Sequence, residues 1–291
     1  MSLPQPSSGR RVAVLIHLWI GLALTAYLIV LSLTGSLIVL RPQFHRWLTQ
    51  PQIEVRGARL TETALDGALR RAYPGFVVES IRPARKPEHP SVVTLTHDGA
   101  RSERLFDPYR GVDMGSAYPG ILHAVEWLVR LHDNLLAGST GRIVNGLGGL
   151  LLTVLAVSGL VVWWSGKNRW RSAIWTGQPA MSSVFARRLH VVVGFWTSSL
   201  ILVWAVTAIY FAFPSLFDGL FDLLDRNPDD DARPGEQLLD GVIRLHFGRL
   251  GGMVGRTTWI ILGLVPSMLV VTGVIMWLSR RKRLRPGRVA P

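Results

Sequence analysis

The sequence predicts an α-helical membrane protein with four transmembrane helices, arranged as two tandem halves of two helices each, and a small α+β domain inserted into the first half. Two observations predict this class. Of 291 residues, 48% are hydrophobic, and they gather in long uncharged runs, as in membrane proteins rather than soluble enzymes. The chain also repeats part of its own sequence, so the second half follows the plan of the first.

Four apolar segments are each long enough to cross a hydrocarbon core, for which a helix needs about 20 residues. The first follows Arg10 and Arg11, but its apolar run is longer than the core of a signal peptide, so we interpret it as a retained span. The second span is preceded by an outer segment that begins at residue 121 and carries histidines, and we treat residues 121–164 as one unit. We expect the four transmembrane helices at residues 12–40, 143–164, 189–213 and 253–279.

Basic residues cluster just outside these segments, which accounts for the formal net charge of +13 without a nucleic-acid partner. They lie before the first span, in the loop 165–188 and in the tail 280–291. The positive-inside rule therefore predicts that both termini and this loop face the cytoplasm. The inserted domain and the loop 214–252, with an acidic run at 225–236, are expected on the opposite side.

The repeat is clearest between residues 131–165 and 245–279, which align at an offset of 114 without a gap. They share 13 of 35 residues, including one histidine, a Gly-Arg pair and a tryptophan in register. Apolar composition alone explains shared leucine and valine, but not these residues. The first and third spans align at an offset of 173, with five identities in 28 positions, and match His17 with His190. We interpret the chain as a tandem duplication whose halves run in the same direction.

The two halves differ in the length of their outer loops. His17 and His132 are 115 residues apart, whereas His190 and His246 are 56 apart, so the first half carries 59 extra residues. We assign this excess to the small domain, at residues 48–120.

The small domain should consist of one helix and a short sheet. Residues 61–73 have the apolar spacing of an amphipathic helix, and Thr61 is placed to cap it. Three strands are expected at 76–81, 91–96 and 104–107, the last ended by the turn Asp107-Pro108-Tyr109-Arg110-Gly111.

This helix, the Tyr-Pro-Gly after it, the strands and the Asp-Pro-Tyr-x-Gly turn resemble a PepSY domain. The motif His-x-Trp-x-Gly-Leu from residue 17, the Arg-Trp-Leu after the first span and the Ser-Gly-Leu-Val-Val-Trp-Trp-Ser-Gly from residue 158 are similar to the PepSY-associated transmembrane family. This bacterial family includes inner-membrane ferric-siderophore reductases and iron-regulated membrane proteins. The resemblance covers nearly the whole chain and implies an inner-membrane location, a periplasmic PepSY-like domain and a role connected with iron.

Four of the eight histidines correspond between the halves, His17 with His190 toward the cytoplasm and His132 with His246 toward the outside. An ionisable side chain near membrane depth is costly, so its default interpretation is functional. Two neutral imidazoles from separate helices are the usual axial ligands of a b-type haem, which needs no cysteine, and the chain has none. We therefore hypothesise two haems b, each bound by one histidine pair.

Other interpretations of these histidines remain open. Each could cap or hydrogen-bond a neighbouring helix, or each pair could bind zinc or another bare metal, although matched carboxylates are missing. Arg142 and Arg256 each follow an outer histidine by ten residues, where a guanidinium could pair with a haem propionate or only reach the interface. A straight helix would put His132 about 48 Å from Trp164, so we expect a break at the glycine-rich run 137–141.

These features predict a transmembrane oxidoreductase, and the resemblance implies that it reduces a ferric chelate or ferric siderophore outside the membrane. No residue is assigned to catalysis itself. No Gly-x-Gly-x-x-Gly motif follows a predicted strand, so a cytoplasmic partner protein or quinol would have to supply the electrons. The alternative is a non-enzymatic membrane protein that regulates or senses iron uptake through protein contacts. A transporter or channel is disfavoured because no Asp, Glu or Lys lies inside a predicted span.

Overall fold

The computed structural model describes residues 8–55, 57–164, 183–224 and 234–284, which belong to two compact units. The helical unit comprises residues 1–39 and 129–291, and the α+β unit comprises residues 40–128. Three predicted features fall partly outside the described residues: the basic loop at 165–182, the acidic run at 225–233 and the basic tail at 285–291.

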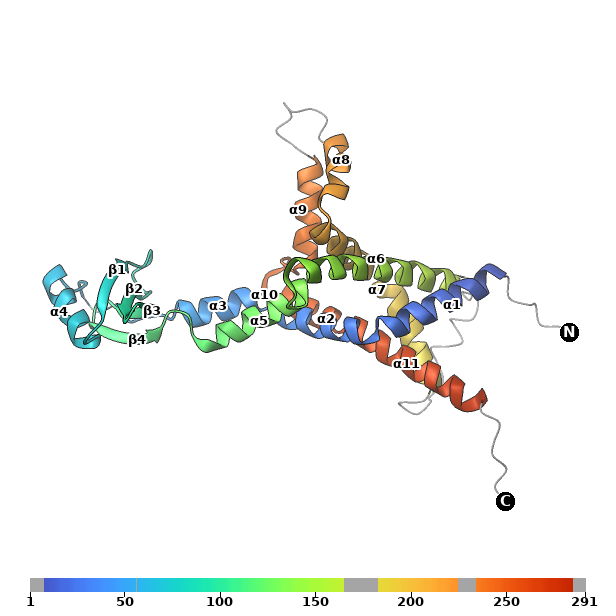
Figure 1. The fold of residues 1–291 in the computed structure, drawn as a ribbon, viewed down its shortest axis with the longest axis horizontal. Coiled ribbons are helices and arrows are strands. Elements are labelled where there is room, and N and C mark those ends of the chain that lie inside the picture. The colour runs from blue at the N-terminus through green and yellow to red at the C-terminus, as the bar shows by residue number, and fades with distance from the viewer. Residues whose placement is uncertain (1–7, 56, 165–182, 225–233, 285–291) are drawn as a thin grey trace, which may run out of the picture. The chain divides into compact units, whose positions relative to one another are not determined.

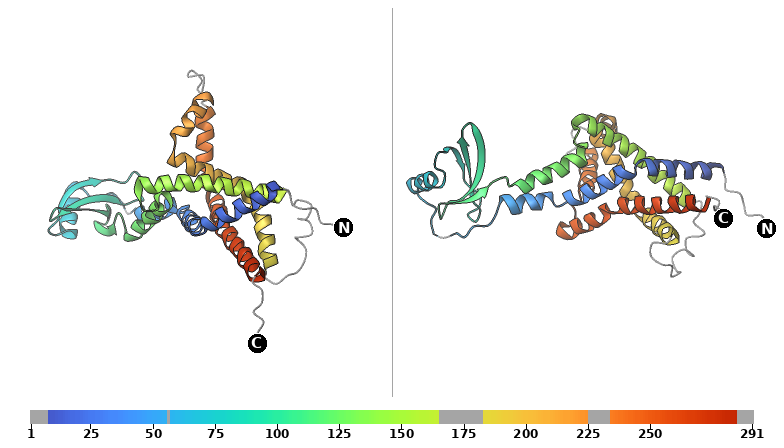
Figure 2. Two further views of the ribbon diagram at one scale, coloured as in Figure 1. Left: turned by 45° about the vertical axis from the view of Figure 1, so that its right-hand side comes forward. Right: turned by 60° about the horizontal axis from the view of Figure 1, so that its bottom comes forward.

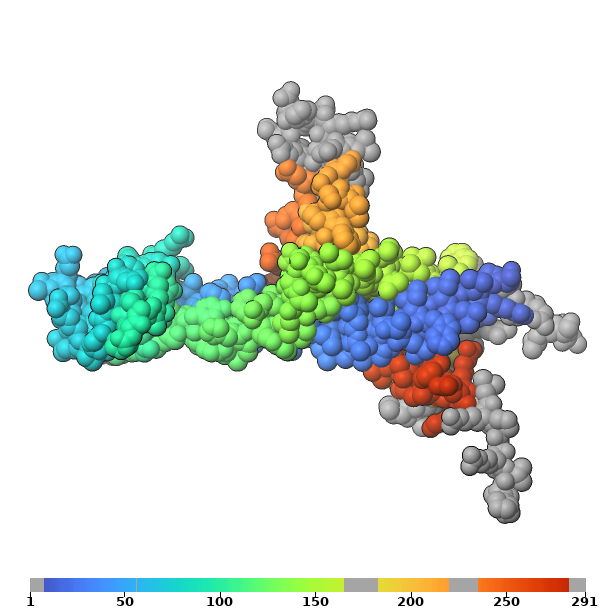
Figure 3. All heavy atoms as spheres, viewed as in Figure 1, coloured from blue at the N-terminus to red at the C-terminus, as the bar shows by residue number. Residues whose placement is uncertain are grey.

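The long helices of the helical unit gather in one bundle (Figure 1), and their contacts form a closed ring. α1 packs against α6, α6 against α7, and α7 against α11. The ring closes where α11 meets α2 and α1, and α10 also packs against α2. Figure 3 shows the close contact between α1, in blue, and α6, in yellow-green. These helices are α1 (Ser8–Ala23), α2 (Thr25–Ile38), α6 (Gly138–Trp164), α7 (Ser183–Ala212), α10 (Gly252–Gly263) and α11 (Val265–Leu284).

Three segments of this unit are long and apolar enough to cross a membrane: Gly138–Trp164, Ser183–Ala212 and Gly252–Lys282. α1 and α2 would together make a fourth span, but they are bent by 64°. The segment predicted as one span at residues 12–40 is therefore a broken pair of helices. At the bend, the Thr25 hydroxyl donates a hydrogen bond to the Gly21 carbonyl at 3.0 Å, one turn back, which is an arrangement that bends helices.

The two faces of α6 show the pattern expected of a helix in lipid. Its exposed positions carry large apolar side chains such as Leu147, Leu150, Val154 and Val157. Membrane helices approach one another through small residues and present apolar side chains to the lipid. With its candidate spans, the chain is a multi-pass membrane protein. The buried positions of α6 are small or polar, namely Gly141, Asn145, Gly146, Gly148, Gly149 and Ser158.

The span formed by α10 and α11 is interrupted by a side chain from α2. The Ser32 hydroxyl donates to the Gly263 carbonyl at 2.5 Å and accepts the backbone N–H of Ser267 at 3.2 Å. These two backbone groups would bond directly in an unbroken helix. A side chain inserted into the backbone ladder is a recognised cause of a helix break. The absence of a side chain at Gly263 is required here, since a Cβ would lie 2.5 Å from the Ser36 hydroxyl oxygen.

Two shorter helices, α8 (Ser215–Leu224) and α9 (Pro234–His246), occupy the segment predicted only as an outer loop at 214–252. They lie side by side, and α9 also packs against α7 (Figure 2). Because α9 ends on His246, it carries that histidine to the end of α7.

The α+β unit contains a four-stranded antiparallel sheet in the order β1-β2-β3-β4. α4 (Glu62–Ala72) packs on one face, where Leu69 and Tyr73 contact Val93, Leu95 and Phe106. The predicted cap is confirmed, since the Thr61 side chain accepts a hydrogen bond from the backbone of Ala64. The strands are β1 (Val77–Arg82), β2 (Ser91–His97), β3 (Ala100–Asp107) and β4 (Val112–Ser116).

A polar network joins α4 to the last two strands. Arg104 on β3 forms an ion pair with Asp113 on β4, and the Tyr73 hydroxyl donates to the same carboxylate at 2.6 Å. The hydrogen bonds from Arg104 hold the pKa of the Asp113 carboxyl below its usual value. Desolvation and the neighbouring carboxylate raise the pKa of the Tyr73 hydroxyl.

Two helices flank the sheet in the chain, α3 (Arg41–Thr49) before it and α5 (Gly120–Asn134) after it. An ion pair of 2.9 Å between Arg41 and Glu126 joins them. The boundary between the two units falls within α5, whose last turns belong to the helical unit and carry His132.

Candidate functional site

His17 on α1 and His190 on α7 lie next to each other inside the helical unit. Their ring centres are 6.1 Å apart and their planes are perpendicular, at 90°. Imidazoles on opposite sides of one metal ion have ring centres about 6 Å apart, because each metal–nitrogen bond is about 2.0–2.1 Å long. The structure therefore brings this pair together at the separation that a shared metal ion requires.

Both rings are oriented by carbonyl oxygens of a neighbouring helix. Nδ1 of His17 donates to the Leu155 carbonyl at 2.9 Å, and Nδ1 of His190 donates to the Leu269 carbonyl at 2.9 Å. A carbonyl oxygen can only accept, so Nδ1 carries the proton and Nε2 keeps a lone pair. Neither Nε2 atom makes a hydrogen bond within the described residues. Metal-binding histidines are commonly held in this way.

Glycines allow the helices to approach both rings closely. A Cβ at Gly159 would lie 2.9 Å from Cε1 of His17, which is too close for two carbon atoms. A Cβ at Gly273 would lie 3.6 Å from Cε1 of His190, which is an ordinary contact. The His17 ring thus packs directly against the backbone of α6 at Gly159, and the His190 ring packs less tightly against α11 at Gly273.

The second pair comes from short helices, His132 from α5 and His246 from α9. Nδ1 of His132 lies 3.1 Å from the Thr34 hydroxyl, and Nδ1 of His246 bonds to the Thr207 hydroxyl. Burial lowers the pKa of both imidazoles, and that of His246 to about 3. Both are neutral at physiological pH, the form that binds a metal ion.

The surroundings of His132 and His246 differ. The His246 ring contacts the phenyl rings of Phe211 and Phe247, with ring centres 5.3 Å away in each case. The His132 ring lies against Gly35, where a Cβ would be 2.7 Å from its Cε1. His246 therefore has the more apolar environment of the two.

Asn145 on α6 holds the end of α5 in place beside the spans. Its side-chain amide donates to the backbone carbonyls of His132 and Asp133, at 2.8 and 2.7 Å. These carbonyls lie in the last turn of α5, where no further backbone N–H is available to them. Asn145 was not among the residues predicted from the sequence, although an Asn inside an apolar span is itself a signal of a specific contact.

The chain turns sharply between His132 and α6, as predicted, but the turn lies at residues 135–137 rather than 137–141. Leu135 and Leu136 have positive φ angles of 50° and 61°. This conformation costs roughly 1–2 kcal/mol for each residue with a side chain. The corresponding turn of the second half contains glycines with positive φ, at 248, 251 and 252.

The hydrogen-bond partners correspond at the offsets of the sequence repeat. When two histidines correspond between the halves, the residues that contact their rings also correspond at the same offsets. The pairs separated by 114 positions are Leu155 and Leu269, Ser158 and Thr272, and Gly159 and Gly273; Thr34 and Thr207 are separated by 173.

The two arginines predicted near the outer histidines have different contacts. Arg142 donates to the Asp133 carboxylate at 2.8 Å, with about half of its side chain exposed. Arg256 makes no ion pair with any residue that the structure describes. The residue corresponding to Asp133 in the second half is Phe247, which explains why the ion pair is not repeated.

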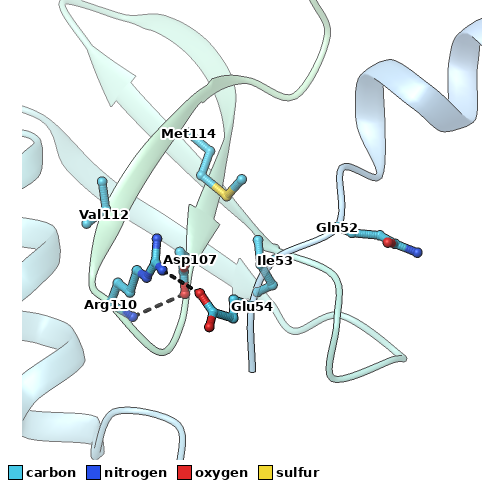
Figure 4. Close-up of a pocket in the computed structure, with 7 residues that line it drawn as sticks. All are labelled: Gln52, Ile53, Glu54, Asp107, Arg110, Val112 and Met114. Atoms are coloured by element: carbon cyan, nitrogen blue, oxygen red, sulfur yellow. Dashed lines mark hydrogen bonds and ion pairs between the residues drawn. The ribbon is translucent and has the colours of Figure 1, made fainter. Parts of the chain in front are cut away.

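The remaining four histidines lie in the α+β unit and make local contacts. Within the described residues, no group of three or more His, Cys, Asp or Glu is arranged to hold a metal ion. A shallow pocket of ≈ 360 Å³ in this unit is crossed by an ion pair of 2.9 Å between Arg110 and Glu54 (Figure 4). The contacts of three of these histidines are His45 with Thr49, His97 with Gly75, and His123 with Tyr118.

Comparison with protein families matches the chain to the family described as "PepSY-associated TM region", over residues 14–234 and 223–280. The matched residues include all four paired histidines. A search of curated proteins finds no match to the sequence.

Proposed function

The chain belongs to the PepSY-associated TM family, and we propose that it is a haem b-containing oxidoreductase of the bacterial inner membrane. The observation that carries the proposal is the pair His17 and His190, with ring centres 6.1 Å apart and each Nδ1 on a carbonyl oxygen. This arrangement leaves both Nε2 atoms available to one iron ion. A bound haem supplies one-electron chemistry, because its iron alternates between ferric and ferrous states.

The residues around both pairs fit this role. His17 and His190 would hold one haem iron, and His132 and His246 would hold a second. Glycines let the helix backbone approach the rings of His17, His190 and His132 closely. Arg256 is the better placed of the two arginines to pair with a propionate, because Arg142 would first have to leave Asp133.

We further propose that the chain is a tandem duplication of a two-helix half, with a PepSY-like domain at residues 48–120 inserted into the first. The shared identities in sequence and the corresponding hydrogen bonds of the four histidines support this. The positive-inside rule supports cytoplasmic termini, a cytoplasmic loop at 165–188 and a periplasmic α+β unit. In this orientation His17 and His190 lie toward the electron donor, and His132 and His246 toward the acceptor.

The proposed reaction passes electrons outward, one at a time, to a ferric chelate or ferric siderophore in the periplasm. The acceptor's Fe³⁺ gains one electron and becomes Fe²⁺, and no bond of the protein is made or broken. The electron comes from a cytoplasmic partner protein or from quinol. The choice of an iron substrate rests on the resemblance of the sequence to inner-membrane ferric-siderophore reductases.

The absorption spectrum of the purified full chain tests the haem. We expect a Soret band that shifts when dithionite is added and the visible bands of a haem with two histidine ligands. A folded, colourless protein that also fails to bind added haemin would overturn the proposal.

Replacement of His190 tests the pairing. The variant His190→Ala should keep about half of the wild-type haem, because it removes a ligand from one centre only. His123→Ala, which changes a histidine of the α+β unit, is the matched control and should keep all of it. An unchanged haem content in His190→Ala would contradict the assignment of this pair.

A second candidate function is regulation or sensing through protein contacts, without electron transfer. The exposed edge of the α+β unit favours it, because all six residues of β1 are exposed and edge strands readily accept a partner chain. The colourless outcome of the spectroscopic test would support this second function.

A further inference from the structure

We propose that the hydrogen-bond acceptors behind the four imidazoles give the His132–His246 centre the higher reduction potential, and that Thr207 is the residue that sets it. This inference rests on the proposed function, because it assigns a direction to electron flow between the two proposed centres. Electrons would then move downhill from the cytoplasmic pair to the outer pair.

The inner pair has strong acceptors. His17 and His190 both donate from Nδ1 to a backbone carbonyl at 2.9 Å, and each has a hydroxyl within 3.3 Å as well. An amide carbonyl draws the Nδ1 proton away from the ring and makes the ring a stronger electron donor at Nε2. A more basic ligand stabilises the ferric state relative to the ferrous state, so these contacts lower the reduction potential of the inner centre.

The outer pair has a weaker acceptor at His246. Within the described residues, Nδ1 of His246 bonds to the Thr207 hydroxyl and to no backbone carbonyl. The Thr207 hydroxyl donates its own proton to the Val203 carbonyl at 2.7 Å, so it accepts from the imidazole. A neutral hydroxyl oxygen carries less negative charge than an amide oxygen. His246 is therefore less basic toward a metal ion than His17 and His190, whose Nδ1 atoms bond to carbonyl oxygens, and this difference raises the potential of the outer centre.

The apolar surroundings of His246 act in the same direction. Phe211 and Phe247 each approach the His246 ring to 5.3 Å between ring centres. An apolar shell excludes water and penalises the more highly charged ferric state, which raises the reduction potential. This contribution is independent of the hydrogen bond of Thr207.

The electron balance of the proposed step is simple. With haem bound at both pairs, one electron would leave the centre held by His17 and His190, which would be oxidised, and would enter the centre held by His132 and His246, which would be reduced. The Nδ1 protons of the four histidines remain on their rings, because each Nδ1–H stays hydrogen-bonded to its acceptor. The inner centre is then reduced again by the donor, and the outer centre delivers its electron to the ferric acceptor.

Potentiometric titration of the full chain in detergent, followed by absorption spectroscopy, tests the gradient. The single-centre variants His190→Ala and His246→Ala identify which midpoint belongs to which pair. We expect the centre that survives in His190→Ala to have the higher midpoint potential. Equal midpoints, or the reverse order, would overturn the inference while leaving the proposed haem function intact.

Substitution of Thr207 tests whether its hydroxyl sets the reduction potential of the outer centre. In Thr207→Val the ring loses its acceptor, and the ratio of reduced to oxidised outer centre at a fixed potential should rise about tenfold, equivalent to about 59 mV for one electron. Thr207→Ser keeps the hydroxyl and should restore the wild-type midpoint. Thr272→Val is the matched control at the inner pair, where the Leu269 carbonyl remains and the shift should be much smaller.

The outcomes separate the two proposals. A wild-type chain that binds no haem overturns the proposed function and with it the gradient. A wild-type chain with two haems whose outer midpoint is the same in Thr207→Val overturns the role of Thr207 alone. If Thr207→Val loses its outer haem, two measurements still test the inference. The midpoint of Thr207→Ser tests the role of the hydroxyl, and the order of the midpoints in the single-centre variants tests the gradient.

Discussion

An alanine at position 159 should damage the inner histidine pair, whereas an alanine at the corresponding position 273 should be tolerated. A Cβ at position 159 would lie 2.9 Å from Cε1 of His17, and a Cβ at position 273 would lie 3.6 Å from Cε1 of His190. Carbon atoms in favourable contact are about 3.5–4.0 Å apart, so His17 would have to retreat by about 0.6 Å and His190 would not have to move.

His17 has little freedom to retreat. Its Nδ1 is held by the Leu155 carbonyl at 2.9 Å and lies 3.3 Å from the Ser158 hydroxyl. A displacement of about 0.6 Å exceeds the tolerance of about 0.5 Å within which functional side chains must be held. Overpacking of this kind costs about 1–3 kcal/mol. If that energy is lost from metal binding, the affinity of the inner centre falls about five- to 150-fold.

The assay is a titration of haem-depleted full chain with haemin, followed at the Soret band. Wild type and Gly273→Ala should each show two tight sites, and Gly159→Ala should show one tight and one weakened site. Circular dichroism at the same temperature checks that the helices are intact in all three proteins. Equal affinities in the two alanine variants would refute the argument from ring clearance.

Two further predictions concern stability. The lowered pKa of Asp113 means that its carboxylate stabilises the fold above its unfolded pKa of about 3.9 and that this contribution is lost as the pH falls through the lower folded value. Asp113→Asn should therefore reduce the thermal stability of the full chain at pH 7, by about 1–2 kcal/mol for a partly exposed charged hydrogen bond. The difference should shrink as the pH falls below the unfolded value, and a difference that stays constant with pH would contradict the prediction. Ser32→Ala should cost about 1–2 kcal/mol, because it removes the hydroxyl that bridges α10 and α11. Thr258→Ala, an exposed change in α10, is the control in the same thermal unfolding assay, and equal losses would remove any special role for Ser32.

Periodicity and composition predicted the elements that depend on local sequence. The helix predicted at 61–73 and its cap at Thr61 were confirmed. Both could be predicted because an amphipathic spacing that follows a threonine is typical of a capped helix. The three predicted strands were found at nearly the predicted positions. β4 was missed because its five residues include Asp113 and Gly115, which are both uncommon in strands. It forms because Arg104 and Tyr73 satisfy the Asp113 carboxylate.

The breaks in the helices depended on contacts that the sequence does not display. The turn after His132 was expected in the glycine run, and Gly138 of that run does have a positive φ, but the turn begins earlier because Leu135 and Leu136 adopt positive φ angles as well. At the bend in the first span the Thr25 hydroxyl bonds to the Gly21 carbonyl, but threonines make the same contact inside the continuous helices α6 and α7, so residue type alone does not predict the bend. The break between α10 and α11 depends on Ser32, which is 231 residues away from Gly263 along the chain.

The candidate site was predictable in its residues but not in its hydrogen bonds. The repeat alone selected His17, His132, His190 and His246 from eight histidines, because selection by offset needs no knowledge of packing. The carbonyl acceptors are backbone atoms, so their identity follows from the register of helix against helix and not from residue type. The pairing of Arg142 with Asp133 was missed for a different reason, since the turn that brings them together was placed a few residues too late.

Helix capping explains part of the geometry of these histidines but not the rest. A structural histidine needs one hydrogen bond to a neighbouring helix, and the Nδ1 bonds of His17 and His190 satisfy that need. Capping gives no reason for the second nitrogen of each ring to lack a hydrogen bond within the described residues, since an unsatisfied polar atom in a membrane span is unfavourable. It also gives no reason for the two rings to meet at 6.1 Å, or for a glycine to stand beside each ring in both halves. A ligand shared between the two Nε2 atoms accounts for all three features, and a bare ion such as zinc would need further ligands that the pair does not offer. A haem iron needs only the two axial nitrogens, which is why this cofactor agrees best with a site built from two imidazoles and small residues.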